Sequence, residues 1–152
     1  MSTAARPQGC TNFKLRQLMR RVARHYDAEL ARAGLKTTQY SLLSHVLHLG
    51  PLRPVDLARE MGLTPSTLTR NLQPMVAAGW LELADGPDAR SRLVAITPAG
   101  RAKRAEAQRR WRAAQEGLNA LLGVERVAAL HALIDDSLGL LAGGEDEGAH
   151  DE

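Results

Sequence analysis

The chain has 152 residues and a net charge of +3, which fits one domain or one compact unit with an added dimerisation element. Apolar residues make up 44% of the chain but only 3% are aromatic, so the core must consist mainly of Leu, Val and Ala, a composition that favours packed helices. No run approaches the ~18 apolar residues of a membrane span, and residues 1–10 lack the apolar stretch of a signal peptide, so we expect a cytoplasmic protein without a membrane partner.

The first third of the chain predicts two helices. Residues 11–33 carry apolar side chains at spacings of three and four, and Gly34 is suited to end this helix. Thr37 or Thr38 is expected to cap a second helix, which continues with the same apolar spacing until Gly50 and Pro51 close it.

Residues 53–80 predict a helix-turn-helix. A short helix from about Val55 to Met61 is expected to stop at Gly62, where the turn needs a positive φ. Thr64 then provides an N-cap and Pro65 occupies the first position of a second helix, which Gly79 closes.

Two short apolar runs, residues 80–83 and 92–97, flank the turn sequence of residues 85–88 and predict a β-hairpin. A helix-turn-helix followed directly by a hairpin is a winged helix. We therefore predict a mainly α (α+β) fold whose winged helix-turn-helix lobe spans residues 36–100.

A long Arg-rich helix is predicted from Pro98 onward, with residues 101–114 as the connection to a last helix after Gly123. The apolar side chains of this last helix have no partner left within the lobe. We expect residues 11–35 and 115–142 to form a dimerisation domain with a second copy, the alternative being packing on the first helix of the same chain.

The charge of the chain is uneven. Residues 143–152 hold five acidic side chains and no Lys or Arg, so residues 1–142 carry 20 basic and 12 acidic side chains, a balance of +8. Such a balance is typical of nucleic-acid-binding proteins, although a solvated basic surface produces the same count. Residues 1–10 and the acidic end, residues 143–152, are expected to be disordered.

The second helix of a helix-turn-helix presents its N-terminal residues to the major groove. Arg70 can form a bidentate contact with guanine, Gln73 lies one turn further along and can read adenine, and short hydroxyl side chains suit phosphate oxygens. The alternative for the hydroxyls is that they only cap the helix. Pro74 is expected to bend the helix or end its regular geometry beyond the reading residues. The predicted contacts are Thr64, Ser66, Thr67, Thr69, Arg70 and Gln73.

Three charged residues in the hairpin, Asp88, Arg90 and Arg92, are spaced two apart. A thin hairpin tip can place Arg90 in a narrow A·T-rich minor groove, while Asp88 holds the guanidinium in a fixed orientation. Arg92 would then contact a phosphate. Charged side chains are also common at turns that bind nothing.

These residues resemble the MarR family of bacterial winged-helix regulators over roughly residues 15–141. The most specific parts are "LAREMGLTPSTLTRNLQPMVAAGWLEL" and the wing signature formed by Asp88, Arg90, the run "LVAI", Thr97 and Gly100. The resemblance implies a homodimer that reads a pseudo-palindromic DNA operator, usually as a repressor. It also places the wing arginine of the family at Arg90 and its orienting acid at Asp88.

Many members of that family release DNA when a small phenolic or aromatic acid enters a cleft beside the dimerisation helices. Such a ligand needs a cation for its carboxylate and flat apolar walls. Our candidates are Arg16, Arg20, Tyr40 and Trp111. The alternative is that the rings belong to the core and the arginines to a solvated surface.

The peroxide-sensing branch of the family suggests a second hypothesis, a redox-sensing repressor that uses Cys10. This cysteine lies two residues too early for the family position, and of the two tyrosines that such relatives use, one falls at Tyr26 and the other at Thr37. An inert thiol is the alternative.

Other classes of protein find little support in the sequence. His45 and His48 have helical ligand spacing but lack acidic or thiol partners nearby, so we expect no metal and no cofactor. Neither a phosphate-binding Gly-rich loop nor a catalytic nucleophile motif is present, so we expect no enzyme. A winged helix used only for protein–protein contact remains the alternative from a different class.

Overall fold

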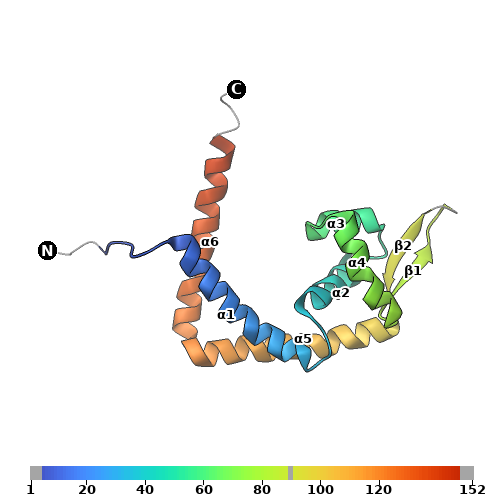
Figure 1. Cartoon of the computed structure of the whole chain (residues 1–152), viewed down its shortest axis with the longest axis horizontal. Coiled ribbons are helices and arrows are strands. Elements are labelled where there is room, and N and C mark those ends of the chain that lie inside the picture. The colour runs from blue at the N-terminus through green and yellow to red at the C-terminus, as the bar shows by residue number, and fades with distance from the viewer. Residues whose placement is uncertain (1–4, 89–90, 148–152) are drawn as a thin grey trace. The chain divides into compact units, whose positions relative to one another are not determined.

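The computed structural model describes residues 5–88 and 91–147 (Figure 1). Within these ranges, six helices and two strands follow one another. They are α1 Thr11–Ala31, α2 Thr37–Leu49, α3 Pro54–Met61, α4 Pro65–Ala77, β1 Leu81–Asp85, β2 Arg92–Ile96, α5 Pro98–Leu122 and α6 Val124–Glu147. The chain divides into two compact units, residues 1–114 and residues 115–152.

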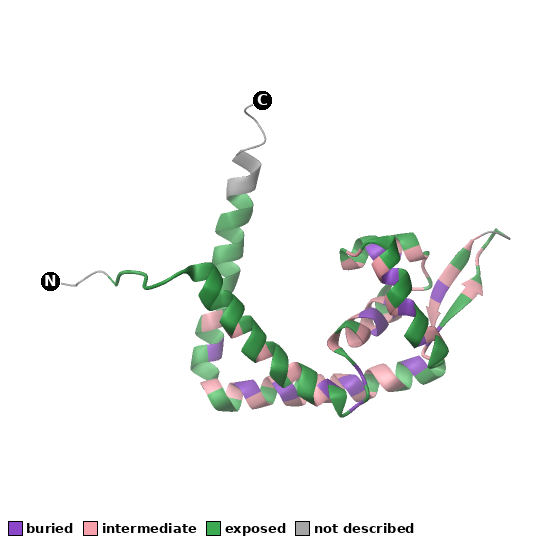
Figure 2. Ribbon diagram, in the orientation of Figure 1, coloured by how far each residue is buried: buried purple, intermediate pink, exposed green. Residues whose placement is uncertain are grey.

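The core of the first unit is aliphatic, as the composition predicts. Leu, Val, Ala and Met side chains from α1 to α5 form one buried cluster (purple in Figure 2), and within the described residues every buried side chain is apolar. The largest fully buried members are Leu30, Leu42, Leu43, Val46, Leu57, Leu68, Met75, Leu81 and Val94. This cluster fixes the lobe on which the candidate DNA contacts lie.

The first two helices differ slightly from prediction. Helix α1 ends at Ala31, and Gly34, at φ +74°, closes the turn that follows by donating its N–H to the Ala31 carbonyl. The N-cap of α2 is Lys36 rather than Thr37 or Thr38, so that prediction is wrong. The reason is that the Gln39 side chain accepts the Lys36 N–H at 2.9 Å, and the helix therefore starts one residue earlier.

The helix-turn-helix is confirmed. Gly62 adopts the left-handed conformation at φ +64°, and the next N–H, of Leu63, donates to the Ala58 carbonyl at 2.8 Å. Thr64 is the N-cap of α4 and accepts the Thr67 N–H, with Pro65 at the first helical position.

Helix α4 runs through Pro74 to Ala77, so the expected early end of regular geometry does not occur there. Pro74 removes one N–H, but its own carbonyl still accepts the Ala78 N–H at 3.0 Å. The last turn of the helix therefore keeps a closing hydrogen bond.

The wing is an antiparallel hairpin whose register pairs Leu83 with Val94 and Asp85 with Arg92. Strand β1 begins one residue later than the predicted strand of residues 80–83 and ends two residues later, closer to the turn. Leu52, just before α3, forms a bridge with Val94 and so adds a third piece of extended chain to the hairpin. The helix-turn-helix and the wing are thus hydrogen-bonded to each other.

Helix α5 has the predicted bounds, but α6 continues to Glu147, which corrects the expectation that residues 143–147 are disordered. Extending a formed helix adds a hydrogen bond per residue without a new nucleation cost, and this offsets the Gly residues there. Residues 148–152 lie outside the described residues. Within the part that the structure describes, no single helix is long and apolar enough to cross a membrane, and only the bent pair α5–α6 passes by length and composition.

Candidate nucleic-acid interface

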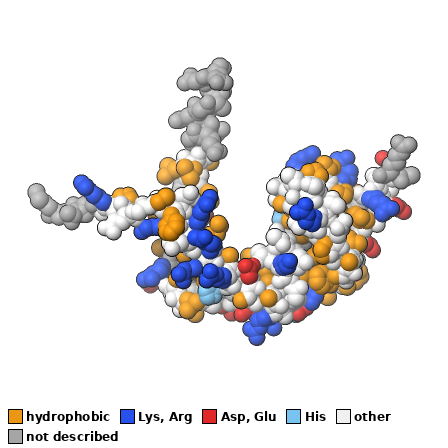
Figure 3. Space-filling view, in the orientation of Figure 1, with side chains coloured by type: hydrophobic (Ala, Val, Ile, Leu, Met, Phe, Trp, Pro, Cys, Tyr) orange, Lys and Arg blue, Asp and Glu red, His pale blue; other side chains and the backbone are white. Residues whose placement is uncertain are grey.

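Helix α4 has one buried and one exposed face. Leu68, Leu72 and Met75 enter the core, whereas Ser66, Thr69, Arg70 and Gln73 are exposed. The exposed side chains belong to the set predicted to contact DNA, so the fold leaves this face available. Figure 3 shows Lys and Arg side chains on the surface of the lobe over α3 and beside the hairpin.

The four hydroxyls at the start of α4 all bond within the helix. The Thr64 hydroxyl lies 2.8 Å from that of Thr67 and 3.3 Å from that of Ser66, and the Thr69 hydroxyl donates to the Pro65 carbonyl at 2.9 Å. Among the four, only Thr64 caps the helix by accepting a backbone N–H, whereas Thr69 bonds the carbonyl of the preceding turn. Phosphate oxygens accept hydrogen bonds, so a phosphate contact from these residues would need a hydroxyl proton that the bonds within the helix leave free.

Arg70 and Gln73 are different. Within the described part of the chain, neither side chain takes part in an ion pair or hydrogen bond, and both are exposed one turn apart on α4. Their donors are thus free to meet base edges or phosphates.

The wing carries the remaining predicted contacts. Arg92 is exposed on β2 and lies in register with Asp85. The backbone of Asp88 closes the turn, since its carbonyl accepts the Ser91 N–H at 3.1 Å and the Ser91 hydroxyl at 3.2 Å. Arg90 lies outside the described residues, so the predicted pairing of Asp88 with Arg90 stays a prediction.

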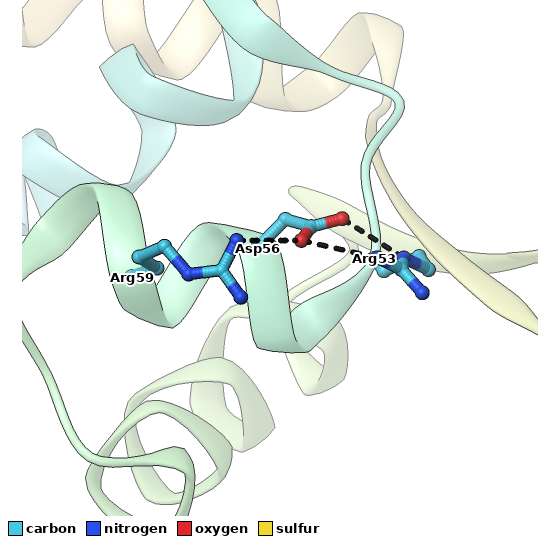
Figure 4. A network of polar contacts seen from close by, with 3 residues as sticks. All are labelled: Arg53, Asp56 and Arg59. Carbon is cyan, nitrogen blue, oxygen red and sulfur yellow. Dashed lines mark hydrogen bonds and ion pairs between the residues drawn. The ribbon is translucent and has the colours of Figure 1, made fainter.

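A cluster that the sequence analysis missed lies on α3. Arg53 donates to both carboxylate oxygens of Asp56, at 2.9 and 3.2 Å, and Arg59 approaches the same carboxylate at 3.5 Å (Figure 4). The hydrogen bond from Arg53, together with the charges of both arginines, lowers the pKa of Asp56, and the same bond raises the pKa of Arg53. The spacing of opposite charges at three residues is the signal that could have revealed it.

The predicted ligand residues are only partly brought together. Trp111 of α5 packs between two tyrosines, with ring centroids 4.3 Å from Tyr26 and 5.2 Å from Tyr40. Burial raises the pKa of Tyr26. Arg16 and Arg20 are exposed on α1, and Arg20 lies about 9 Å before Tyr26 along the helix axis at ~1.5 Å per residue.

A different cation lies beside the rings. The Arg104 guanidinium is 5.9 Å from the Tyr40 ring centroid, and it donates to the Ser44 hydroxyl and the Gln108 side chain. Arg104 precedes Trp111 by two helical turns, so both side chains lie on one face of α5. A hollow of about 450 Å³ further along α5 has only charged lining residues, Glu106, Arg109 and Arg110, and does not suit an aromatic ring.

The remaining candidates are placed as follows. Cys10 is exposed and immediately precedes α1. His45 bonds the Ser41 carbonyl through Nδ1 at 2.7 Å. Among the described residues, no group of three His, Cys, Asp or Glu side chains lies close enough to hold a metal ion.

A helix-turn-helix joined to a β-hairpin and followed by two long helices defines the winged-helix class of transcription regulators. Residues 33–91 match the model of the MarR family. The chain is 30% identical over 97 residues to the multiple antibiotic resistance protein MarR of Salmonella typhimurium, an alignment that covers 63% of this chain and 65% of that protein. The match to the MarR family model thus covers α2, α3, α4 and β1. The chain spans 61–65% of the length of the curated relatives it matches.

Solved structures agree with this assignment. The M. tuberculosis regulator MosR in complex with DNA is 30% identical, with a TM-score of 0.62, over 86% of this chain and 98% of that one. The repressor CouR bound to a 23-mer DNA duplex has a TM-score of 0.76 at 21% identity, over 85% of this chain and 92% of CouR, a likeness that concerns the fold alone. The resemblance and the fold class are confirmed by these matches.

Proposed function

We propose that this chain is a cytoplasmic, homodimeric, sequence-specific DNA-binding repressor whose release from DNA is controlled by a small aromatic acid. The observation that carries the DNA-binding part is the exposed face of α4, where Arg70 and Gln73 are unengaged within the described residues. MosR, which is 30% identical and was solved in complex with DNA, adds support.

The dimer is supported by apolar side chains that the single chain leaves exposed. Phe13, Leu15 and Met19 of α1 are 54–66% exposed, and several large apolar side chains of α6 are 41–81% exposed. Exposed apolar side chains grouped on a helix mark an interaction site. In a dimer with two-fold symmetry, the two α4 helices would read half-sites about one DNA turn, ~34 Å, apart.

The proposed aromatic ligand would use the flat faces of Tyr40 and Trp111, with Arg104 as the cation for its carboxylate. Arg104 replaces Arg16 and Arg20 in this role because it is the arginine that lies over the Tyr40 ring. The tight ring stacking means that a ligand must separate or cover the rings rather than enter a gap between them.

The test of DNA binding is a gel shift with the full chain and the intergenic DNA upstream of its own gene, repeated at several salt concentrations. Genuine phosphate contacts make the affinity fall steeply as salt rises. Binding to no duplex at any salt concentration would instead favour a protein-interaction module.

The test of ligand control repeats this assay with benzoate or 4-hydroxybenzoate as the probe and cyclohexanecarboxylate as the non-aromatic control. The expected result is DNA release by the aromatic acids, abolished in Arg104→Ala and retained in Arg20→Ala. If Arg20→Ala abolishes DNA release and Arg104→Ala retains it, the cation that binds the carboxylate is Arg20 of α1. If Cys10 is the sensor, peroxide will release DNA in the wild type but not in Cys10→Ser.

A further inference from the structure

The Arg53–Asp56–Arg59 cluster is a network of ion pairs in the lobe to which the proposed function assigns no role. The two cations point outward and the anion lies between them: the Arg53 and Arg59 side chains are 60% and 75% exposed, whereas that of Asp56 is 32% exposed. A molecule that approaches α3 therefore meets two positive side chains before it meets the carboxylate.

The position of each arginine is set by local structure. Arg53 is the N-cap of α3, and Pro54 after it restricts its backbone to an extended conformation. The two-point contact with Asp56 then fixes the plane of the guanidinium. An arginine has five N–H donors, so two used on Asp56 leave three for another anion.

The cluster also has a defined place in the fold. Helix α3 is the first helix of the helix-turn-helix and packs on α4, and Leu52, next to Arg53, is hydrogen-bonded to Val94 of the wing. Arg53 thus stands at the junction between α3 and the hairpin. In a helix-turn-helix, the first helix crosses the DNA backbone while the second enters the groove.

We infer that Arg53 and Arg59 form a phosphate contact on the DNA backbone and that Asp56 is the positioning residue that holds both guanidinium groups in place. This inference rests on the proposed DNA-binding function. It adds to that function a sequence-independent contact beside the base-reading residues of α4.

A cluster that only stabilises α3 would behave differently. Coulomb attraction alone predicts that removal of the Asp56 charge strengthens DNA binding, because an anion near phosphates is taken away. The positioning role predicts the opposite sign, since two arginines lose their fixed orientation. The sign of the effect at Asp56 therefore separates the two accounts.

The experiment measures the affinity of the full chain for a bound intergenic duplex and for unrelated DNA by fluorescence anisotropy, as a function of salt. We expect Arg53→Ala and Arg59→Ala each to weaken binding roughly 3- to 10-fold on both duplexes, and to lower the salt slope by about 1 for each phosphate that the variant no longer binds. Asp56→Ala and Asp56→Asn should weaken binding ~2- to 5-fold, the range of an exposed ion pair.

Glu60→Ala is the matched control, because Glu60 is an exposed acid on the same helix without an ion pair among the described residues. Its affinity should equal or exceed that of the wild type. Arg53→Lys keeps the charge but not the two-point geometry, so its affinity should fall between those of the wild type and Arg53→Ala. Thermal unfolding followed by circular dichroism verifies that each variant is folded.

Two results would overturn the inference. If the Asp56 variants bind DNA as tightly as Glu60→Ala does, Asp56 has no positioning role. If the salt slopes of both arginine variants equal that of the wild type, Arg53 and Arg59 do not contact phosphates. A wild-type protein without salt-sensitive DNA binding would refute the proposed function itself, an outcome visible before any variant is made.

Discussion

The Thr97 hydroxyl donates to the Gly79 carbonyl at 2.6 Å and joins the end of the wing to the end of α4. The same oxygen lies 3.1 Å from the Trp80 carbonyl and accepts the Gly100 N–H at 3.0 Å, which caps the start of α5. One side chain therefore holds the helix-turn-helix, the hairpin and α5 together. This gives a physical reason for the Thr in the wing signature.

Thr97→Val should lower the free energy of unfolding by about 1–2 kcal/mol, because the shape is kept while a helix cap and a hydrogen bond are removed. Urea unfolding measures the change. Thr97→Ser should recover most of it, and Thr69→Val, which removes an exposed hydroxyl from a helix, should stay within about 0.5 kcal/mol of the wild type. A decrease in Thr97→Ser as large as in Thr97→Val would show that the methyl group, not the hydroxyl, matters.

Much of the helix-turn-helix was predictable because its signals are local. Gly62, Thr64 and Pro65 each determine backbone conformation within one or two residues, and the structure has the predicted cap and turn there. The N-cap of α2 was not predicted, since Thr is usually preferred over Lys as an N-cap. The choice depended on the Gln39 side chain.

Contacts distant in sequence were not predictable. Arg104, rather than Arg16 or Arg20, lies over Tyr40 because α5 packs against α2, and the two residues are more than 60 positions apart. Gly100 belongs to the wing signature, but its role needs the structure. A Cβ there would clash with the Trp80 carbonyl oxygen, so only glycine allows the start of α5 to approach the backbone just before β1 this closely.

Arg70→Ala should reduce discrimination at one base pair of each half-site by about 1–3 kcal/mol, because the bidentate hydrogen bonds to a base edge are removed. Anisotropy with a set of single-base operator variants measures this. Arg112→Ala, at an exposed arginine of α5, is the matched control and should leave the preference unchanged. Equal decreases in affinity on every sequence would assign Arg70 to a phosphate instead.

Arg90→Ala should weaken binding by about 1–3 kcal/mol without lowering the thermal unfolding temperature, because a wing-tip arginine draws its affinity from a narrow minor groove. The effect should shrink when G·C pairs replace the A·T pairs that flank the half-sites. If the variant instead keeps its affinity and unfolds at a lower temperature, the assignment of Arg90 to DNA is wrong.

Leu138→Glu should convert a dimer to a monomer, because a charge would enter the apolar face of α6 where Leu138 is 61% exposed in the single chain. Light scattering after size exclusion reports the mass. Ala132→Glu is the control, since Ala132 lies on the face that carries Asp135 and Asp136, and it should stay dimeric. A wild-type monomer would refute the proposed dimer.

Burial against its surroundings, among them the Trp111 ring, raises the pKa of Tyr26 above its ordinary value of 10.0. In Tyr40→Phe, Tyr26 is the one tyrosine left in the chain, so the phenolate absorbance follows it alone. The folded protein should titrate above pH 10.0, and the urea-unfolded protein at the ordinary value.

The sign of the stability effect follows from this difference. Because the folded state holds the phenolic proton more tightly than the unfolded state, the contribution is complete below the unfolded pKa of about 10 and is lost as the pH rises through the folded pKa. Urea unfolding across this pH range should therefore show that the free energy of unfolding of Tyr40→Phe declines as the pH rises. The decline should be smaller in Tyr26→Phe/Tyr40→Phe. Trp111→Ala should bring the Tyr26 pKa back toward its ordinary value, and an unchanged pKa in that variant would mean that Trp111 does not desolvate the phenol.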